Sequence, residues 1–144
     1  MAWPCTLTVE DVPPRYFTPD EANELLAAVR PFAERMVEHR RALVGLEKKH
    51  ATLLRAVAGN GGLRPGELAA AQRRVERETA ALARCAEAIQ ELGAVVKDPE
   101  QGLVDFPARR GDEDVYLCWQ VGEDRVEFWH GTDEGFAGRR PLPL

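Results

Sequence analysis

The sequence contains no serine and only three cysteines, and both shortages restrict the chemistry that the chain can perform. The absence of serine excludes a Ser/His/Asp hydrolase. Cys5, Cys85 and Cys118 lie far apart and form no CxxC pair, which argues against a zinc ribbon or a disulfide framework. Such thiols are typical of a reducing compartment, and the first residues lack the basic start and apolar stretch of a signal peptide. We therefore expect a cytoplasmic protein.

Long apolar runs are also missing, and basic residues are scarce toward the C-terminal end. No run approaches the ~20 apolar residues that a membrane span requires, so a membrane is not an expected partner. The net charge is −5, and residues 98–144 carry 11 acidic residues against five arginines. This acidic part would repel a phosphate backbone, so nucleic acid is not an expected partner either.

The residues that are present indicate a globular protein. The chain is 44% apolar and 30% charged, which separates it from disordered sequences. Its 144 residues suit a single domain, residues 1–144, with one buried core. Within that domain the patterns distinguish an N-terminal segment (1–17), a helical hairpin (18–93), and a small β-sheet with a C-terminal loop (94–144).

A long helix is predicted to begin at Thr18. Thr18 as N-cap, Pro19 in the first turn and Glu21 three residues after the cap match the capping-box pattern. Pro31 lies inside the helix and predicts either a kink or two helices nearly end to end. Apolar residues recur at steps of three and four until the glycine-rich residues 58–62 end the pattern: Leu25, Val29, Phe32, Met36, Leu43, Leu46, Leu53 and Val57.

A second helix is predicted from about Pro65 to Leu92, closed by Gly93. The short connection makes the two helices antiparallel neighbours. Apolar residues repeat every seven positions, as in coiled coils: Leu68, Val75, Leu82 and Ile89. A small sheet can cover only part of this apolar seam, so we expect a homodimer formed through the seam, in which the seam residues His39 and His50 set the register.

The remainder of the chain alternates as strands do. A strand is expected at Gly102–Phe106, and "DVYLCWQV" and "RVEFWH" alternate around the turn residues "GED". If that turn is tight, Cys118, Glu127 and Trp129 share one sheet face and His130 lies on the other. Residues 7–9 could add another strand. The predicted fold class is α+β: a long, coiled-coil-like antiparallel helical hairpin with a small C-terminal antiparallel β-sheet.

Three stretches resemble a known family. "RYFTPDEANELL", "LGAVVKDPEQGLVDFPA" and "VYLCWQVGEDRVEFWHGTDEGFAGRRPL" are similar to bacterial proteins classified as domain of unknown function 2203. The resemblance covers nearly the whole chain, and the specific part is the C-terminal string GLVDFP, LCW, GE, FWH and GFAGR. It implies one intact domain of bacterial type, and it supplies no catalytic or binding residue.

The sheet region contains a cluster of potential metal ligands. Carboxylate, thiolate and imidazole groups together suit zinc or iron, and the candidates are Asp105, Cys118, Glu127 and His130. The predicted strand faces separate His130 from Cys118 and Glu127, unless a bulge at Gly131 redirects it. The alternative is a structural role for each: a small buried cysteine, a solvated glutamate, and a strand-end histidine bonded to the backbone.

A second candidate site lies at the C-terminal loop. The glycines of "GTDEGFAGRRP" could direct backbone N–H groups into one concavity, where Arg139 or Arg140 would hold a small anion. Trp129 and His130 would border it. The alternative is a turn-rich coil that anchors Phe136 in the core, with Arg139 paired to an acid such as Asp105, and with Trp129 covered by the N-terminal segment or a second subunit.

Three functions follow from these features. The first is a non-catalytic binding or regulatory module, a dimeric scaffold that binds a small anionic ligand or a protein through Trp129, His130, Arg139 and Arg140. The second is a metal-dependent enzyme that uses the Asp/Cys/Glu/His cluster with zinc or iron. The third is a structural protein whose hairpin associates with another coiled coil. The sequence alone leaves open whether the chain catalyses a reaction.

Overall fold

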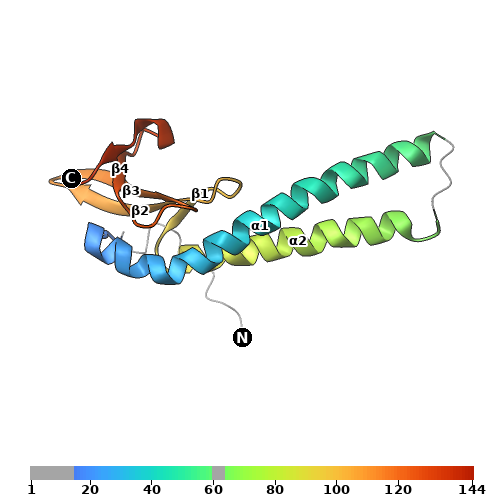
Figure 1. Cartoon of the computed structure of the whole chain (residues 1–144), viewed down its shortest axis with the longest axis horizontal. Coiled ribbons are helices and arrows are strands. Elements are labelled where there is room, and N and C mark those ends of the chain that lie inside the picture. Colours follow the sequence, from blue (N-terminus) through green and yellow to red (C-terminus); the bar gives the residue numbers. More distant parts are fainter. Residues whose placement is uncertain (1–14, 60–63) are drawn as a thin grey trace, which may run out of the picture.

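The computed structural model describes residues 15–59 and 64–144 and confirms the α+β prediction. Two antiparallel helices form a long hairpin, and a five-stranded antiparallel sheet follows at one end of it (Figure 1). The strands are ordered as they occur in the chain, β1-β2-β3-β4-β5. The elements are α1 (Pro19–Ala58), α2 (Glu67–Glu91), β1 (Val95–Asp98), β2 (Leu103–Arg110), β3 (Glu113–Gln120), β4 (Phe128–Gly131), the 3-10 helix η1 (Phe136–Gly138) and β5 (Arg140–Pro141).

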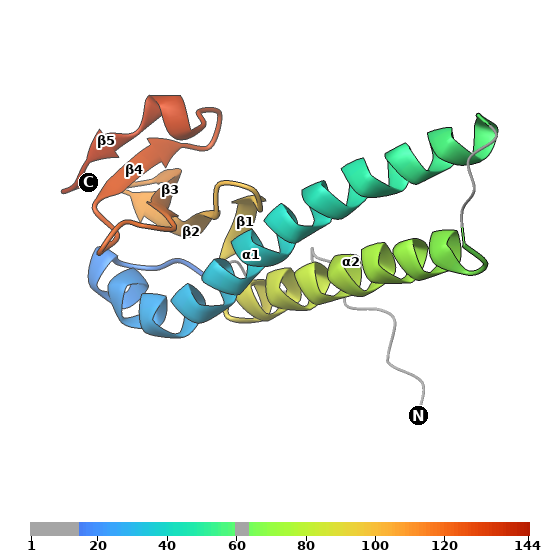
Figure 2. The ribbon, with the colours of Figure 1, turned by 45° about the vertical axis from the view of Figure 1, so that its right-hand side comes forward.

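Helix α1 begins where the capping pattern predicts. The Thr18 hydroxyl accepts the Glu21 N–H and the Glu21 carboxylate accepts the Thr18 N–H, each at 3.1 Å. These reciprocal bonds satisfy two N–H groups that a helix start leaves free. The helix continues through Pro31 as one element. Its first turns bend away from the line of the rest (Figure 2), as expected where a proline removes a helix hydrogen bond.

The helical hairpin is held together along its seam. His39 of α1 lies on that seam, as predicted, and its Nδ1 is 2.6 Å from Oε2 of Glu78 on α2. The pair therefore fixes the register of the two helices within one chain. Helix α2 ends at Glu91, and Gly93, two residues further on, has the φ of +100° that glycine tolerates best. Neither of the described helices combines the length and apolarity that crossing a membrane would require.

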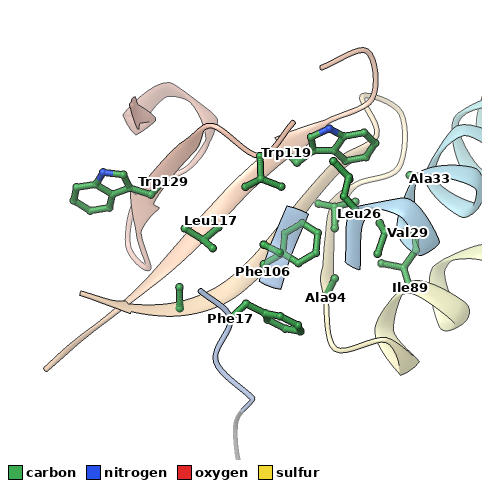
Figure 3. Packing of buried hydrophobic residues seen from close by; sticks show 14 of the residues in the cluster. Phe17, Leu26, Val29, Ala33, Ile89, Ala94, Phe106, Leu117, Trp119 and Trp129 are labelled. Carbon is green, nitrogen blue, oxygen red and sulfur yellow. The ribbon is translucent and has the colours of Figure 1, made fainter. Parts of the chain in front are cut away.

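The core lies between one face of the sheet and the nearby ends of both helices (Figure 3). Alternate residues of β2 and β3 point into it, because Val104 pairs with Trp119 and Phe106 with Leu117 across the two strands. The helices contribute buried apolar side chains to the same cluster, among them Leu26, Val29, Ala33 and Ile89. We call this side of the sheet the inner face and the opposite side the outer face.

The strand predicted at Gly102–Phe106 is present but longer, running as β2 from Leu103 to Arg110. Gly102 forms the turn before it with a φ of +68°, and a Cβ there would lie 2.4 Å from Val121. Only glycine fits this position. The strand considered at residues 7–9 lies outside the described residues.

The predicted tight turn between β3 and β4 is wrong, and with it the assignment of side chains to faces. Seven residues, 121–127, connect the strands, and the register pairs Cys118 with Phe128 and Tyr116 with His130. Residues paired across antiparallel strands share a face, so His130 lies on the outer face with Cys118. A shift of one residue in register reverses every side chain of a strand, and no bulge at Gly131 is needed.

Candidate functional site

Three neighbouring strands bring an acid, a thiol and an imidazole together on the outer face. Asp105 of β2 pairs directly with Cys118 of β3, and His130 of β4 lies two residues along from Phe128, the residue opposite Cys118. One ligand atom from each of the three lies within 4.8 Å of the other two. All three residues are buried, with exposed fractions of 1% or less. The pairing of the strands therefore creates a compact cluster, which we call the Asp/Cys/His cluster.

The orientation of His130 is fixed by hydrogen bonds on both ring nitrogens. Nδ1 lies 2.8 Å from the carbonyl oxygen of Gly131, which can only accept, so Nδ1 carries the proton and donates it. Nε2 lies 3.0 Å from Oδ2 of Asp105. The backbone thus sets the imidazole so that Nε2 faces the acid and the thiol.

Burial shapes the electrostatics of the other two members. Burial raises the pKa of Asp105 above its usual range. A charge on the nearby His130 acts in the opposite direction because it favours the ionised carboxylate, but burial has the larger effect. Within the described part of the chain, Oδ1 of Asp105 has no hydrogen-bond partner. Burial first, and then the charge of Asp105, raise the pKa of Cys118 to about 12. An unmetallated cluster therefore holds a protonated thiol and a poorly solvated carboxyl group.

A Cys/His nucleophile is not the chemistry that this geometry supports. A catalytic cysteine needs a lowered pKa and an imidazole that takes its proton. In the cluster both nitrogens of His130 already face other groups, Gly131 and Asp105, and the pKa of Cys118 moves in the wrong direction. The thiol lies against the acid rather than against a base.

Glu127 does not join the other three predicted ligands. It lies just before β4, in the 121–127 connection, and its side chain is exposed. A tight turn between the strands predicts Glu127 on one face with Cys118, and the structure does not have that turn. The actual connection leaves Glu127 outside the strand, where side chains no longer alternate between the two faces of the sheet.

The contacts of Arg139 and the exposure of Phe136 also differ from those predicted for a coil in the C-terminal loop. Nη2 of Arg139 lies 2.7 Å from both carboxylate oxygens of Glu123, so the partner is Glu123 rather than Asp105. The guanidinium group is stacked between two rings, 4.0 Å from the centre of Phe128 and 4.5 Å from that of Phe136. Phe136 itself is 47% exposed and is not anchored in the core.

The four residues expected to bind an anion are divided between the two faces. Trp129 pairs with Leu117 and is buried on the inner face, with the guanidinium groups of Arg110 and Arg140 each 5.0 Å from its ring centre. Arg140 also bonds to the carboxylate of Glu134 at 3.2 Å. His130 and Arg139 belong to the outer face, so no single concavity collects all four.

Sequence reasoning missed the part played by Glu123. Its carboxylate holds Arg139 and accepts the Gln120 N–H at 2.7 Å, while its backbone carbonyl accepts the indole N–H of Trp119 at 3.0 Å. Glu123 thereby links the end of β3 to the C-terminal loop. In the sequence it stands inside "GED", which reads as an ordinary exposed turn, and no local signal separates it from its neighbours.

Comparison with known proteins supports the resemblance seen in the sequence. No curated protein and no solved structure matches the chain. The profile of one family, described as "Uncharacterized conserved protein (DUF2203)", matches residues 15–142, which include both helices and every strand. On that match the chain belongs to the DUF2203 family.

Proposed function

We propose that the protein is a non-catalytic metal-binding module in which Asp105, Cys118 and His130 hold one zinc ion. The observation that carries the proposal is the convergence of the three ligand atoms, within 4.8 Å of one another, from three different strands. Side chains of these types are the oxygen, sulfur and nitrogen ligands that zinc accepts. Bound zinc would cross-link β2, β3 and β4 on the outer face of the sheet.

The distances in the cluster suit a tetrahedral ion. Zinc bonds of roughly 2.0 Å to nitrogen or oxygen and 2.3 Å to sulfur place neighbouring ligand atoms about 3.3–3.6 Å apart. Nε2 of His130 and Oδ2 of Asp105 already lie 3.0 Å apart, and the cluster as a whole spans no more than 4.8 Å. Small side-chain adjustments are enough to close the set around an ion.

The surroundings of the ligands favour a metal as well. A metal-bound histidine usually donates its other N–H to a carbonyl or carboxylate, and His130 donates Nδ1–H to Gly131. A divalent cation would also neutralise the carboxylate of Asp105 and a thiolate at Cys118, both of which burial disfavours in the absence of metal. Oδ1 of Asp105, without a partner among the described residues, supplies a further ligand atom.

The burial of the cluster favours metal binding over metal-dependent catalysis. Catalytic zinc sites keep a coordination position open to water or substrate, whereas structural sites are closed. All three proposed ligands are at most 1% exposed. The anion-binding alternative has less support, because Arg139 and Arg140 are already paired with Glu123 and Glu134.

Zinc content tests the proposal directly. Protein purified without a histidine tag and without chelator is expected to carry or take up about one zinc ion per chain, measured by mass spectrometry of the metal and by calorimetric titration. Cys118→Ala is expected to abolish this uptake. Cys85→Ala is the matched control, because Cys85 is also buried but packs in the apolar cluster near the helices, and it should bind zinc as the parent does. Zinc uptake unchanged in Cys118→Ala would contradict the proposal.

The affinity for zinc is expected to rise with pH. Because the pKa of Cys118 is raised to about 12, its thiol is protonated throughout the pH range in which the protein can be studied, and zinc must displace that proton. One displaced proton increases the affinity about tenfold per pH unit. Titrations at pH 6, 7 and 8 in buffers of different ionisation enthalpy measure both the slope and the proton release. An affinity independent of pH would exclude Cys118 as a ligand.

A further inference from the structure

A groove lies between the two helices in the half of the hairpin that is far from the sheet. It has a volume of about 610 Å³ and is lined by Ala42, Gly45 and Leu46 of α1, which are small or apolar. A Cβ at Gly45 would meet no atom within 4 Å, so the space beside this glycine is open. Three basic residues, Lys49 of α1 and Arg74 and Arg77 of α2, also line the groove, together with one acid, Glu78, which is paired with His39. The groove therefore offers an apolar floor with a basic rim.

The two ends of the molecule carry opposite charge. The described residues of the far half of the hairpin, 40–59 and 64–78, contain nine lysines and arginines and four acids. Residues 94–144, which form the sheet and the C-terminal loop, contain six basic residues and 11 acids. Such an arrangement attracts a second molecule in the opposite orientation and repels one that brings like ends together.

The exposed large apolar side chains follow the same division. Among the described residues they are Leu54 and Val57, 48% and 52% exposed, and Phe136, 47% exposed. The first two lie at the end of α1, beyond the groove. Phe136 lies on η1, at the other end of the molecule (Figure 1). Exposed aromatic side chains on a well-held backbone are the usual anchors of protein interfaces.

We propose that two copies of this chain form an antiparallel twofold dimer in which the groove of each receives the Phe136 loop, residues 132–138, of the other. The two contacts are equivalent by symmetry, so the assembly closes on itself. Each contact combines an apolar anchor with attraction between a basic and an acidic half. Stacking against Arg139 holds the Phe136 ring in place before binding, which reduces the entropy that the contact costs.

In the alternative dimer the hairpins lie side by side with both tips at one end, and the like charges of the two copies repel one another. It would bring Lys49 and Arg74 of each copy close to their equivalents and place neither Phe136 ring in a groove. The antiparallel arrangement covers the groove and Phe136 and separates the basic ends. Charge complementarity therefore selects the Phe136 loop of a second copy as the occupant of the groove.

The oligomeric state of the full chain tests this proposal. At a chain concentration of about 100 μM in low salt, light scattering coupled to size exclusion is expected to give the mass of a dimer. Phe136→Ala and the double variant Lys49→Glu/Arg74→Glu are each expected to weaken association at least about tenfold. Arg41→Glu/Arg73→Glu is the matched control, because these exposed arginines lie on the same helices but do not line the groove.

Mixing the two weakened variants distinguishes the proposed contact from any other. A heterodimer of Phe136→Ala with Lys49→Glu/Arg74→Glu contains one intact groove facing one intact Phe136 loop. The mixture is therefore expected to associate more tightly than either variant alone. A monomeric parent protein at this concentration, or a dimer unaffected by Phe136→Ala, would overturn the proposal, the second result indicating contact between two grooves. None of these substitutions touches the Asp/Cys/His cluster, so failure here leaves the zinc test independent.

Discussion

Replacing Trp119 with alanine is expected to lower the free energy of unfolding by about 3–5 kcal/mol, a large part of the ~5–15 kcal/mol that stabilises a typical domain. Trp119 is fully buried on the inner face of the sheet, so its truncation removes many packing contacts and leaves a cavity. The substitution also removes the hydrogen bond from the indole N–H to the Glu123 carbonyl, 3.0 Å long. Lost packing and a lost, partly buried hydrogen bond act in the same direction.

Trp119→Phe is the matched control for this prediction. Phenylalanine keeps much of the buried volume but cannot donate to Glu123, so it should cost less than alanine. Equilibrium unfolding in urea, followed by circular dichroism, measures both variants against the parent. A loss below about 1 kcal/mol for Trp119→Ala would mean that the sheet does not pack on the helices as described.

The consequence of losing Trp119 extends to the connection between β3 and β4. Arg30 of α1 donates hydrogen bonds to the carbonyls of Glu123 and Asp124, at 3.1 and 2.7 Å, and its guanidinium lies 5.4 Å from the centre of the Trp119 ring. The side chain of Asn23 bonds to both the N–H and the carbonyl of Val126. These contacts hold residues 121–127 in a fixed path, and that path sets the register of β4.

The elements of the fold that could be predicted are those whose signals are local. The capping box at Thr18 satisfies the start of α1 with groups three residues apart, and the glycine at position 93 ends α2 through its own backbone. Alternation along β3 correctly places Val115, Leu117 and Trp119 together on one face, the inner face that packs on the helices. Each of these features is decided within a few residues.

The candidate site could be predicted only in its composition. Asp105, Cys118 and His130 were recognisable by chemical type, but their convergence depends on the length of the 121–127 connection. The path of that connection is held in part by Asn23, which lies 103 residues from Val126 in the sequence. Alternation along a strand carries no information about such a long-range contact. An error of one residue in the strand register then moves His130 to the wrong face. Pairing of Arg139 with Glu123 was missed for the same reason.

Asp105→Asn is expected to have opposite effects on the metal-free and zinc-bound protein. Burial raises the pKa of Asp105 above its ordinary value of 3.8, so the folded state binds its proton more tightly than the unfolded state does. The contribution of this group to stability is therefore complete below pH 3.8 and is lost as the pH rises through the raised value. At neutral pH the asparagine amide can still bond to Nε2 of His130 without the buried charge. The metal-free variant should then be as stable as the parent or more stable by about 1 kcal/mol.

With zinc present, the parent protein should be more stable than Asp105→Asn. The parent gains about 2.7 kcal/mol when free zinc reaches one hundred times its dissociation constant, which raises the melting temperature by roughly 6–10 °C for a chain of this size. Asp105→Asn replaces an anionic ligand with a neutral one and should lose most of that gain. Melting curves of both proteins, with chelator and with zinc, give all four values. If Asp105 and His130 were instead a structural ion pair, the variant would be about 3–5 kcal/mol less stable in chelator, and zinc would shift neither protein. The difference in stability between Asp105→Asn and the parent can change sign between chelator and zinc only if the carboxylate destabilises the metal-free protein and binds the ion.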